Sequence, residues 1–125
     1  MNRPTEFPLG IDVVEFRKTE SLYKTHQDKL SRFLTKPERD FVETNSKPPV
    51  ALAMLLGAKE AVFKALRPAW LGVTPFKDIE VIPSKKHFSL KFKGEAKKMV
   101  RSETRLELLF FKQKDFMVVE CAGIW

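Results

Sequence analysis

The chain has 125 residues, of which 43% are hydrophobic and 11 are Phe. This composition excludes an intrinsically disordered chain, which would be poorer in apolar residues, and the length predicts a single domain, residues 1–125, with one core. The single cysteine, Cys121, excludes an intrachain disulfide and a cysteine-based zinc site. A reducing, cytoplasmic location fits this cysteine usage best.

Basic residues outnumber acidic ones by 23 to 16, which gives a net charge of +7. An excess of this size favours anionic partners, such as nucleic acid, a phosphate-rich cofactor, an acidic protein or a membrane surface, although some small domains are basic without a specific partner. No apolar run approaches the roughly 18 residues that a membrane span needs. Residues 1–8 also lack the apolar stretch of a secretory signal, so we expect a soluble protein.

The first half of the chain predicts one strand followed by helices. β-Branched residues predict the strand, and the absence of clean alternation predicts that it is buried on both faces. Thr35 and Glu38 have the spacing of a capping box, which marks a helix start. A later stretch rich in Ala and Leu favours a long helix. We expect a strand over 7–16, helices over 17–34, 36–42 and 50–66, and a loop over 43–49.

The second half predicts mainly strands. The segment FSLKF alternates apolar and polar residues, as a half-buried strand does, and KQKD is typical of a hairpin turn. We expect strands over 78–82, 88–92, 105–111 and 116–122, a short helix over 94–101 and a turn over 112–115. The predicted fold is α+β, with an antiparallel sheet packed against one long helix and one or two shorter helices.

Two segments carry charged residues in unusual surroundings. Asp12 interrupts the apolar strand, where a carboxylate costs free energy unless it is paired, metal-bound or at an exposed edge. Lys59, Glu60 and Lys64 lie among small and apolar residues of the long helix, and Glu60 and Lys64 share a helix face. A surface ion pair and a structural carboxylate would explain each segment separately. Together, two carboxylates with neighbouring lysines have the composition of a Mg²⁺–phosphate site.

These residues lie in an ordered pair of motifs. GIDVVE at residues 10–15, followed by GAKEAVFKAL at 57–66, resembles the signature of the 4′-phosphopantetheinyl transferases, in particular the small, single-domain holo-acyl carrier protein synthase type. Segments within 33–38, 76–81 and 90–96 add to the resemblance, which covers about residues 8–98. Neither motif is decisive alone, but the ordered set with its spacing is fairly specific.

The resemblance implies a Mg²⁺-dependent transfer of 4′-phosphopantetheine from coenzyme A to a serine of an acyl or peptidyl carrier protein, with release of 3′,5′-ADP. It also implies a homotrimer with active sites between subunits. Asp12 and Glu60 would be the metal ligands, and Lys64, assisted by Lys59, would hold the pyrophosphate. Glu60, through a water molecule, would take the proton from the carrier serine.

The resemblance also gives the basic charge a meaning, because both substrates are anions. An acidic carrier protein would meet the basic face of the first predicted helix, and neither nucleic acid nor a membrane is an expected partner. The residues of this basic face are Arg17, Lys18 and Lys24.

Some positions depart from the family pattern. Leu55 and Leu56 stand where the family usually has a basic and an aromatic residue, and residues 108–112 lack the Ser and His of the small type. Lys47 is the candidate for the missing phosphate contact. These departures motivate a second hypothesis, a family member that binds carrier protein or coenzyme A without turnover. A third hypothesis is a basic nucleic-acid-binding domain, although no Gly-Phe RNA-binding signature occurs.

Overall fold

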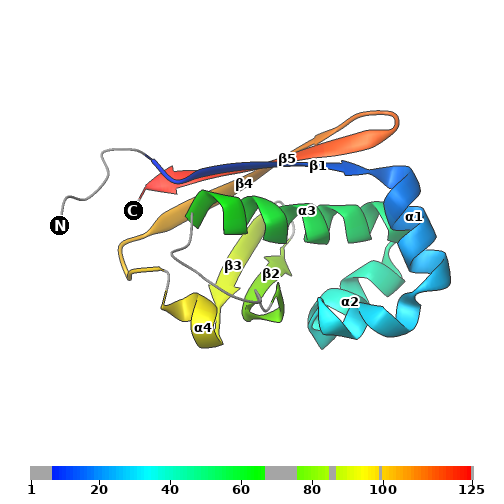
Figure 1. Cartoon of the computed structure of the whole chain (residues 1–125), viewed down its shortest axis with the longest axis horizontal. Coiled ribbons are helices and arrows are strands. Elements are labelled where there is room, and N and C mark those ends of the chain that lie inside the picture. The colour runs from blue at the N-terminus through cyan, green and yellow to red at the C-terminus, as the bar shows by residue number, and fades with distance from the viewer. Residues whose placement is uncertain (1–6, 67–75, 85–86, 99, 125) are drawn as a thin grey trace.

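The computed structural model describes residues 7–66, 76–84, 87–98 and 100–124. They form an α+β fold in which the long helix α3 packs against a three-stranded antiparallel sheet on one side and against β2 of a two-stranded sheet on another (Figure 1). None of the described helices is long and apolar enough to cross a membrane. The elements are β1 Leu9–Glu15, α1 Phe16–Thr25, α2 Lys36–Thr44, α3 Pro48–Leu66, β2 Ile79–Pro83, β3 Phe88–Phe92, α4 Gly94–Lys97, β4 Arg105–Lys112 and β5 Phe116–Ile124.

The larger sheet has the strand order β1-β5-β4, with both neighbouring pairs antiparallel. Its register aligns Asp12 of β1 with Val119 of β5 and Phe110 of β4. Because successive side chains of a strand point to opposite faces, these residues share the inner face, against which α3 packs. Val119 is fully buried there.

Two glycines allow β1, β5 and α3 to approach closely. A Cβ atom at Gly10 would lie 2.0 Å from the main-chain oxygen of Ala61, and one at Gly57 would lie 2.6 Å from Cγ2 of Val119. Atoms this close would overlap, so any larger residue would push the strand and the helix apart. The glycine inside the predicted long helix is therefore explained by packing against the sheet.

The expected single helix over 17–34 is wrong. Helix α1 ends at Thr25, and His26 adopts a non-helical backbone conformation, with φ −134° and ψ 36°. A 3-10 helix, Gln27–Arg32, follows. The break redirects the chain so that Leu30 and Leu34 enter the core, where both are buried.

The expectation that the first strand is buried on both faces is also wrong. Leu9, Ile11 and Val13 are 52%, 46% and 58% exposed, because α3 covers only one face of the sheet.

The expected α+β class is confirmed, as is the capping box of Thr35 and Glu38. The strands form two sheets rather than one, and α3 begins at Pro48, in the first helical turn, where proline is well tolerated.

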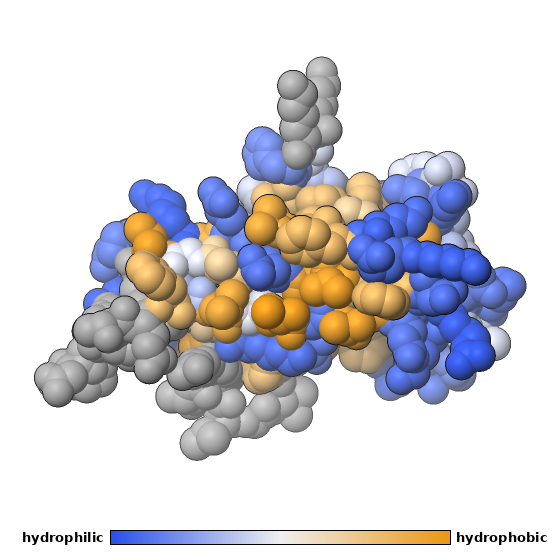
Figure 2. Space-filling view, turned by 90° about the horizontal axis from the view of Figure 1, so that it is seen from above, coloured by the Kyte–Doolittle hydropathy of each residue, from blue (hydrophilic) through white to orange (hydrophobic). Residues whose placement is uncertain are grey.

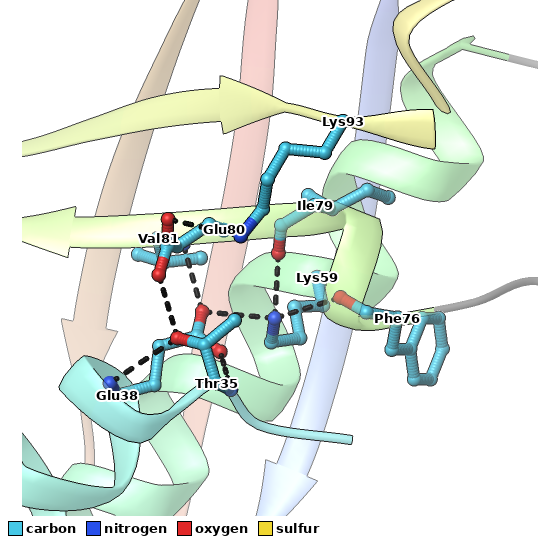
Figure 3. A network of polar contacts seen from close by, with 8 residues as sticks. All are labelled: Thr35, Glu38, Lys59, Phe76, Ile79, Glu80, Val81 and Lys93. Atoms are coloured by element: carbon cyan, nitrogen blue, oxygen red, sulfur yellow. Dashed lines mark hydrogen bonds and ion pairs between the residues drawn. The ribbon is translucent and has the colours of Figure 1, made fainter. Parts of the chain in front are cut away.

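A buried ion pair joins α2, α3 and β2 (Figure 3). The Lys59 ammonium lies 2.8 Å from Oε2 of Glu38, and both side chains are completely buried. Lys59 also donates to the carbonyl oxygens of Phe76 and Ile79, and Glu38 accepts from the backbone N–H of Val81. Each charge is therefore surrounded by hydrogen-bonding partners, which a buried ion pair requires to be stable.

A second carboxylate continues this network toward the surface. Glu80 accepts a 2.6 Å hydrogen bond from the hydroxyl of Thr35 and lies 3.4 Å from the ammonium of Lys93. The hydrogen bond from Thr35, with the positive charge of Lys93, holds the pKa of Glu80 below its ordinary value. Thr35, the N-cap residue of α2, is thus tied to β2 through its side chain.

We predict that Lys59→Met lowers the free energy of unfolding by about 3–5 kcal/mol, because it leaves Glu38 buried without its counter-charge. Urea denaturation followed by circular dichroism would measure the change. The double variant Lys59→Met/Glu38→Gln should recover part of the loss, since no unpaired charge remains. Lys36→Met, which breaks the exposed pair with Asp40, is the matched control and should cost about 1 kcal/mol or less. Equal stability of Lys59→Met and the wild type would contradict this role.

We predict that the stabilisation from Glu80 depends on pH. A carboxyl group whose pKa is lower in the folded state stabilises the fold above its ordinary pKa and loses this effect as pH falls through the lowered pKa. The stability gap between the wild type and Glu80→Gln should therefore be larger at about pH 7 than at about pH 3 in urea denaturation. A gap that stays constant over this range would contradict the prediction.

Candidate active site

Asp12 of β1 and Lys64 of α3 form an ion pair at the junction of strand and helix. The Lys64 ammonium lies 3.1 Å from Oδ1 of Asp12 and also donates to the carbonyl oxygen of Ile11 at 3.1 Å. The Asp12 side chain is 17% exposed and that of Lys64 48% exposed. The pair is thus open to solvent on the lysine side, where a dissolved anion could replace the carboxylate as the lysine's partner.

The packing of β1 on α3 brings Glu60 to the same junction. Gly10 contacts the helix at Ala61, and Gly57 contacts Val14. Asp12 lies between Gly10 and Val14 on the inner face of β1, and therefore lies opposite the helix turn that contains Glu60. Glu60 also shares a helix face with Lys64.

Glu60 is half-buried and forms no ion pair with the described residues. The structure thus pairs Asp12 with Lys64, which is far from it in the sequence, and places Glu60 one helical turn before Lys64 on the same face of α3.

The donor set at this junction fits a hard divalent cation with an open coordination shell. Mg²⁺ takes one or two protein carboxylates and completes its shell with water and phosphate oxygens. The described residues contain no cluster of at least three His, Cys, Asp or Glu side chains, so they provide no closed site of the structural-zinc type. Asp12 and Glu60 are the two residues that could hold Mg²⁺.

The two other predicted cofactor-binding lysines lie elsewhere. Lys59 is completely buried, burial lowers its pKa, and its ammonium is occupied by Glu38 and two backbone carbonyls, so no N–H remains for a phosphate. Lys47 is exposed at the start of α3, where its carbonyl accepts from the first helical N–H groups. It precedes Lys64 by more than four turns, roughly 25 Å at 1.5 Å per residue. Within one chain these lysines therefore do not join the Asp12 junction.

The two leucines that depart from the family pattern are packed into the protein. Leu55 is completely buried, and Leu56 is partly buried against the core. Neither position supplies a charge or an aromatic ring, and Leu55 could not contact a ligand without a rearrangement of the core.

A groove of about 930 Å³, which the sequence reasoning missed, lies between β3 and β4. Alternate residues of both strands line it with apolar side chains, and His87, Arg101 and Arg105 are among its other lining residues. The alternation of apolar and polar residues in these two segments indicates one apolar face on each strand. It does not reveal that the two strands face each other without pairing. The apolar lining consists of Phe88, Leu90, Phe92, Leu106, Leu108 and Phe110.

The predicted carrier-binding residues are exposed on α1. Lys18 pairs with Glu15 and Lys24 pairs with Glu20, each at 3.3 Å. Arg17 instead lines a hollow of about 520 Å³ at the start of α1, together with the hairpin that joins β4 to β5. The three basic side chains are therefore available to an external anion, but none of them approaches Asp12 through a contact that the structure describes.

One face of the larger sheet exposes apolar side chains, and we call it the outer sheet face. Figure 2, seen from above, shows hydrophobic residues gathered on this side of the molecule. Alternate residues of all three strands contribute, because the inner set packs against α3. Its large exposed apolar residues are Leu9, Ile11, Val13, Leu109, Phe111, Phe116 and Ile124.

Fold and site together define a small α+β protein with two carboxylates and a lysine at a strand–helix junction. The model of the 4′-phosphopantetheinyl transferase superfamily matches residues 8–114, so the chain belongs to that superfamily. This confirms the family predicted from the two motifs.

Sequence relatives are holo-[acyl-carrier-protein] synthases. That of Chlamydia caviae is 34% identical over 80 residues, which cover 63% of this chain and 66% of the relative. That of Moorella thermoacetica is 38% identical over 72 residues, or 58% of this chain and 56% of the relative. The match thus spans less than two thirds of either relative.

Solved structures share the fold along almost the whole chain. The Chronobacterium ammoniagenes ACPS–CoA complex has a TM-score of 0.80 at 23% identity, covering 96% of this chain and 98% of the other. The Helicobacter pylori holo-[acyl-carrier-protein] synthase in complex with coenzyme A has a TM-score of 0.72 at 21% identity, covering 92% and 98%. At these identities the similarity establishes the fold.

Proposed function

We propose that this chain is a holo-acyl carrier protein synthase, which transfers the 4′-phosphopantetheine group of coenzyme A to a serine of an apo acyl carrier protein. The serine oxygen bonds to the phosphorus that carries pantetheine, and the bond from that phosphorus to 3′,5′-ADP breaks. The observation that carries this proposal is the junction of Asp12, Glu60 and Lys64 within the segment that matches the superfamily. A peptidyl carrier protein is an equivalent substrate class.

The residues of the junction have separate roles in this proposal. Asp12 and Glu60 hold Mg²⁺, which supplies positive charge to the pyrophosphate when it is bound. Lys64 leaves Asp12 and contacts a pyrophosphate oxygen, because its long side chain is half exposed and its ammonium acts as a mobile point charge. Glu60, through a water molecule, accepts the proton of the carrier serine.

We infer that the complete site forms between copies of the chain, in a homotrimer. The groove between β3 and β4 has apolar lining residues for the organic part of coenzyme A and basic lining residues for its phosphates. It lies along β4, at the edge of the sheet opposite to β1 and Asp12. A groove from one copy beside Asp12 of another would unite the two halves. The exposed apolar outer sheet face supports self-association.

We also propose that the acidic carrier protein binds the exposed basic residues of α1. Opposite charge accelerates encounter and makes binding sensitive to salt.

We propose a cytoplasmic location, which agrees with the free thiol of Cys121. Burial raises the pKa of this thiol to about 12.

Leu55 favours the second hypothesis, a protein that binds carrier protein or coenzyme A without turnover. Its side chain is apolar and completely buried at a position where the family resemblance implies a basic residue. The two hypotheses share their partners and differ in catalysis, so one assay separates them.

We predict that an apo acyl carrier protein incubated with this chain, coenzyme A and Mg²⁺ gains the mass of one phosphopantetheine, measured by intact mass spectrometry. A chelator should abolish the gain. Asp12→Asn and Glu60→Gln should lower the rate by about 100-fold or more, because each removes charge that holds the metal. Asp40→Asn, which changes an exposed carboxylate on α2, is the matched control. Carrier binding without a mass gain would favour the second hypothesis.

We predict that Arg17→Glu and Lys18→Glu raise KM for the carrier protein by about three- to tenfold while kcat changes little, because these residues affect encounter rather than chemistry. The dependence of KM on salt should weaken in both variants. Steady-state kinetics at two salt concentrations would measure both effects, with Lys36→Glu on α2 as the control. A loss of kcat at unchanged KM would argue against a carrier-binding role for α1.

A further inference from the structure

Glu120 lies at the centre of the outer sheet face. It belongs to the central strand β5, and the register places Ile11 of β1 on one side of it and Leu109 of β4 on the other. Its neighbours on the same face of β5 are Val118 and Ala122. Four apolar residues therefore surround one carboxylate, which is already half-buried in a single chain.

No cation of the described residues neutralises Glu120. On the outer face, β1 contributes Glu15, whose partner is Lys18, and β4 contributes Glu107 and Arg105. Arg105 is aligned with Ile124, roughly 13 Å from Glu120 along β5, and donates to the carbonyls of Ser102 and Thr104.

Glu107 is the diagonal neighbour of Glu120 across β4 and β5, so it adds negative charge. Asp12 and Lys112 belong to the opposite face, and α3 packs on that face as well.

The exposed apolar residues of this face and the arrangement of the proposed site point to a second copy of this chain as its occupant. The chain carries +7 overall, yet the strands of this face place Glu15, Glu107 and Glu120 against Arg105, and only Glu15 has a cation beside it, Lys18 of α1. An anionic partner such as nucleic acid or an acidic carrier protein would be repelled here. In the proposed function the groove and Asp12, which lie at opposite edges of the sheet, act together only between two copies, so this inference rests on the proposed function.

Covering this face removes water from Glu120. A carboxylate that is buried among apolar groups without a cation takes up a proton, because the neutral form costs far less to desolvate. Symmetric assembly also brings the same carboxylate from each copy into the same interface, and like charges favour protonation further. Self-association should therefore be accompanied by proton uptake.

We propose that self-association through the outer sheet face is coupled to protonation of Glu120, so that the assembly tightens as pH falls and loosens as pH rises. Glu120 thus makes the oligomeric state, and with it a site built from two copies, sensitive to pH. Only the side chain of Glu120 carries this coupling, and Glu120 is not part of the junction of Asp12, Glu60 and Lys64.

Sedimentation equilibrium of the full chain, at constant ionic strength between about pH 5 and about pH 8, tests this coupling. The wild-type dissociation constant should rise by about tenfold or more across this range. Glu120→Gln, nearly identical in shape and always neutral, should associate tightly at every pH. Glu120→Leu should behave alike, and circular dichroism verifies that both fold. Glu15→Gln, a solvated and paired carboxylate of the same face, should keep the wild-type pH dependence.

The outcomes separate this inference from the proposed function. Weaker association of Glu120→Gln would mean that a cation from the neighbouring copy binds Glu120, and an unchanged pH profile would mean that Glu120 stays solvated; either result overturns the coupling and leaves the homotrimer intact. If wild type and both Glu120 variants remain monomeric at every pH, the homotrimer and this inference both fail. The mass-spectrometric assay still decides the transferase activity independently.

Discussion

The buried ion pair of Lys59 and Glu38 is the constraint on which the rest of the molecule depends. It joins α2, α3 and β2 at one point in the core, and its charges cannot part without leaving one of them unpaired. Adjacent residues of a helix point about 100° apart around its axis. With Lys59 fixed toward β2, the rotation of α3 is fixed, and Glu60 and Lys64 must point toward other sides of the helix. A structural lysine thereby orients its functional neighbours.

The second constraint acts from the opposite side of α3. Gly10 lets the backbone of β1 lie directly against that of α3, and Gly57 makes room on the helix for the side chains of Val14 and Val119. This contact fixes how far Asp12 lies along the helix, just as Lys59 fixes the rotation of the helix. Distance and rotation together determine the junction of Asp12, Glu60 and Lys64. Because each constraint comes from residues outside the junction, the three polar side chains are held by packing and not by their mutual attraction, which would be weak near solvent.

The junction could be predicted from the sequence because an acid inside an apolar strand and an acid–lysine pair on an apolar helix both violate simple patterning. The break at His26 could not be predicted, because the apolar residues on both sides of it keep a near-helical spacing. The chain turns there so that Leu30 can pack in the core, which only the folded structure shows. The family resemblance implies that Lys59 assists Lys64 at the pyrophosphate, whereas the structure buries Lys59 in the core, where lysine is rarely found. Its small apolar neighbours on α3 were the available sign of burial. The exposure of Ile11 and Val13 depends on which face α3 covers, which periodicity alone does not reveal.

The distribution of charge explains why one face alone is suited to self-association. Copies that each carry +7 repel one another, and the repulsion is smallest where they meet through surfaces that are poor in lysine and arginine. The outer sheet face meets this condition, because its strands place only Arg105 on that side. The basic residues of α1 and Arg101 of the groove lie outside this face and are left free for anionic substrates. Glu120 reduces the repulsion further at a distance, but at contact its own desolvation opposes association. The same carboxylate therefore favours the approach of two copies and, unless it is neutralised, disfavours their final packing.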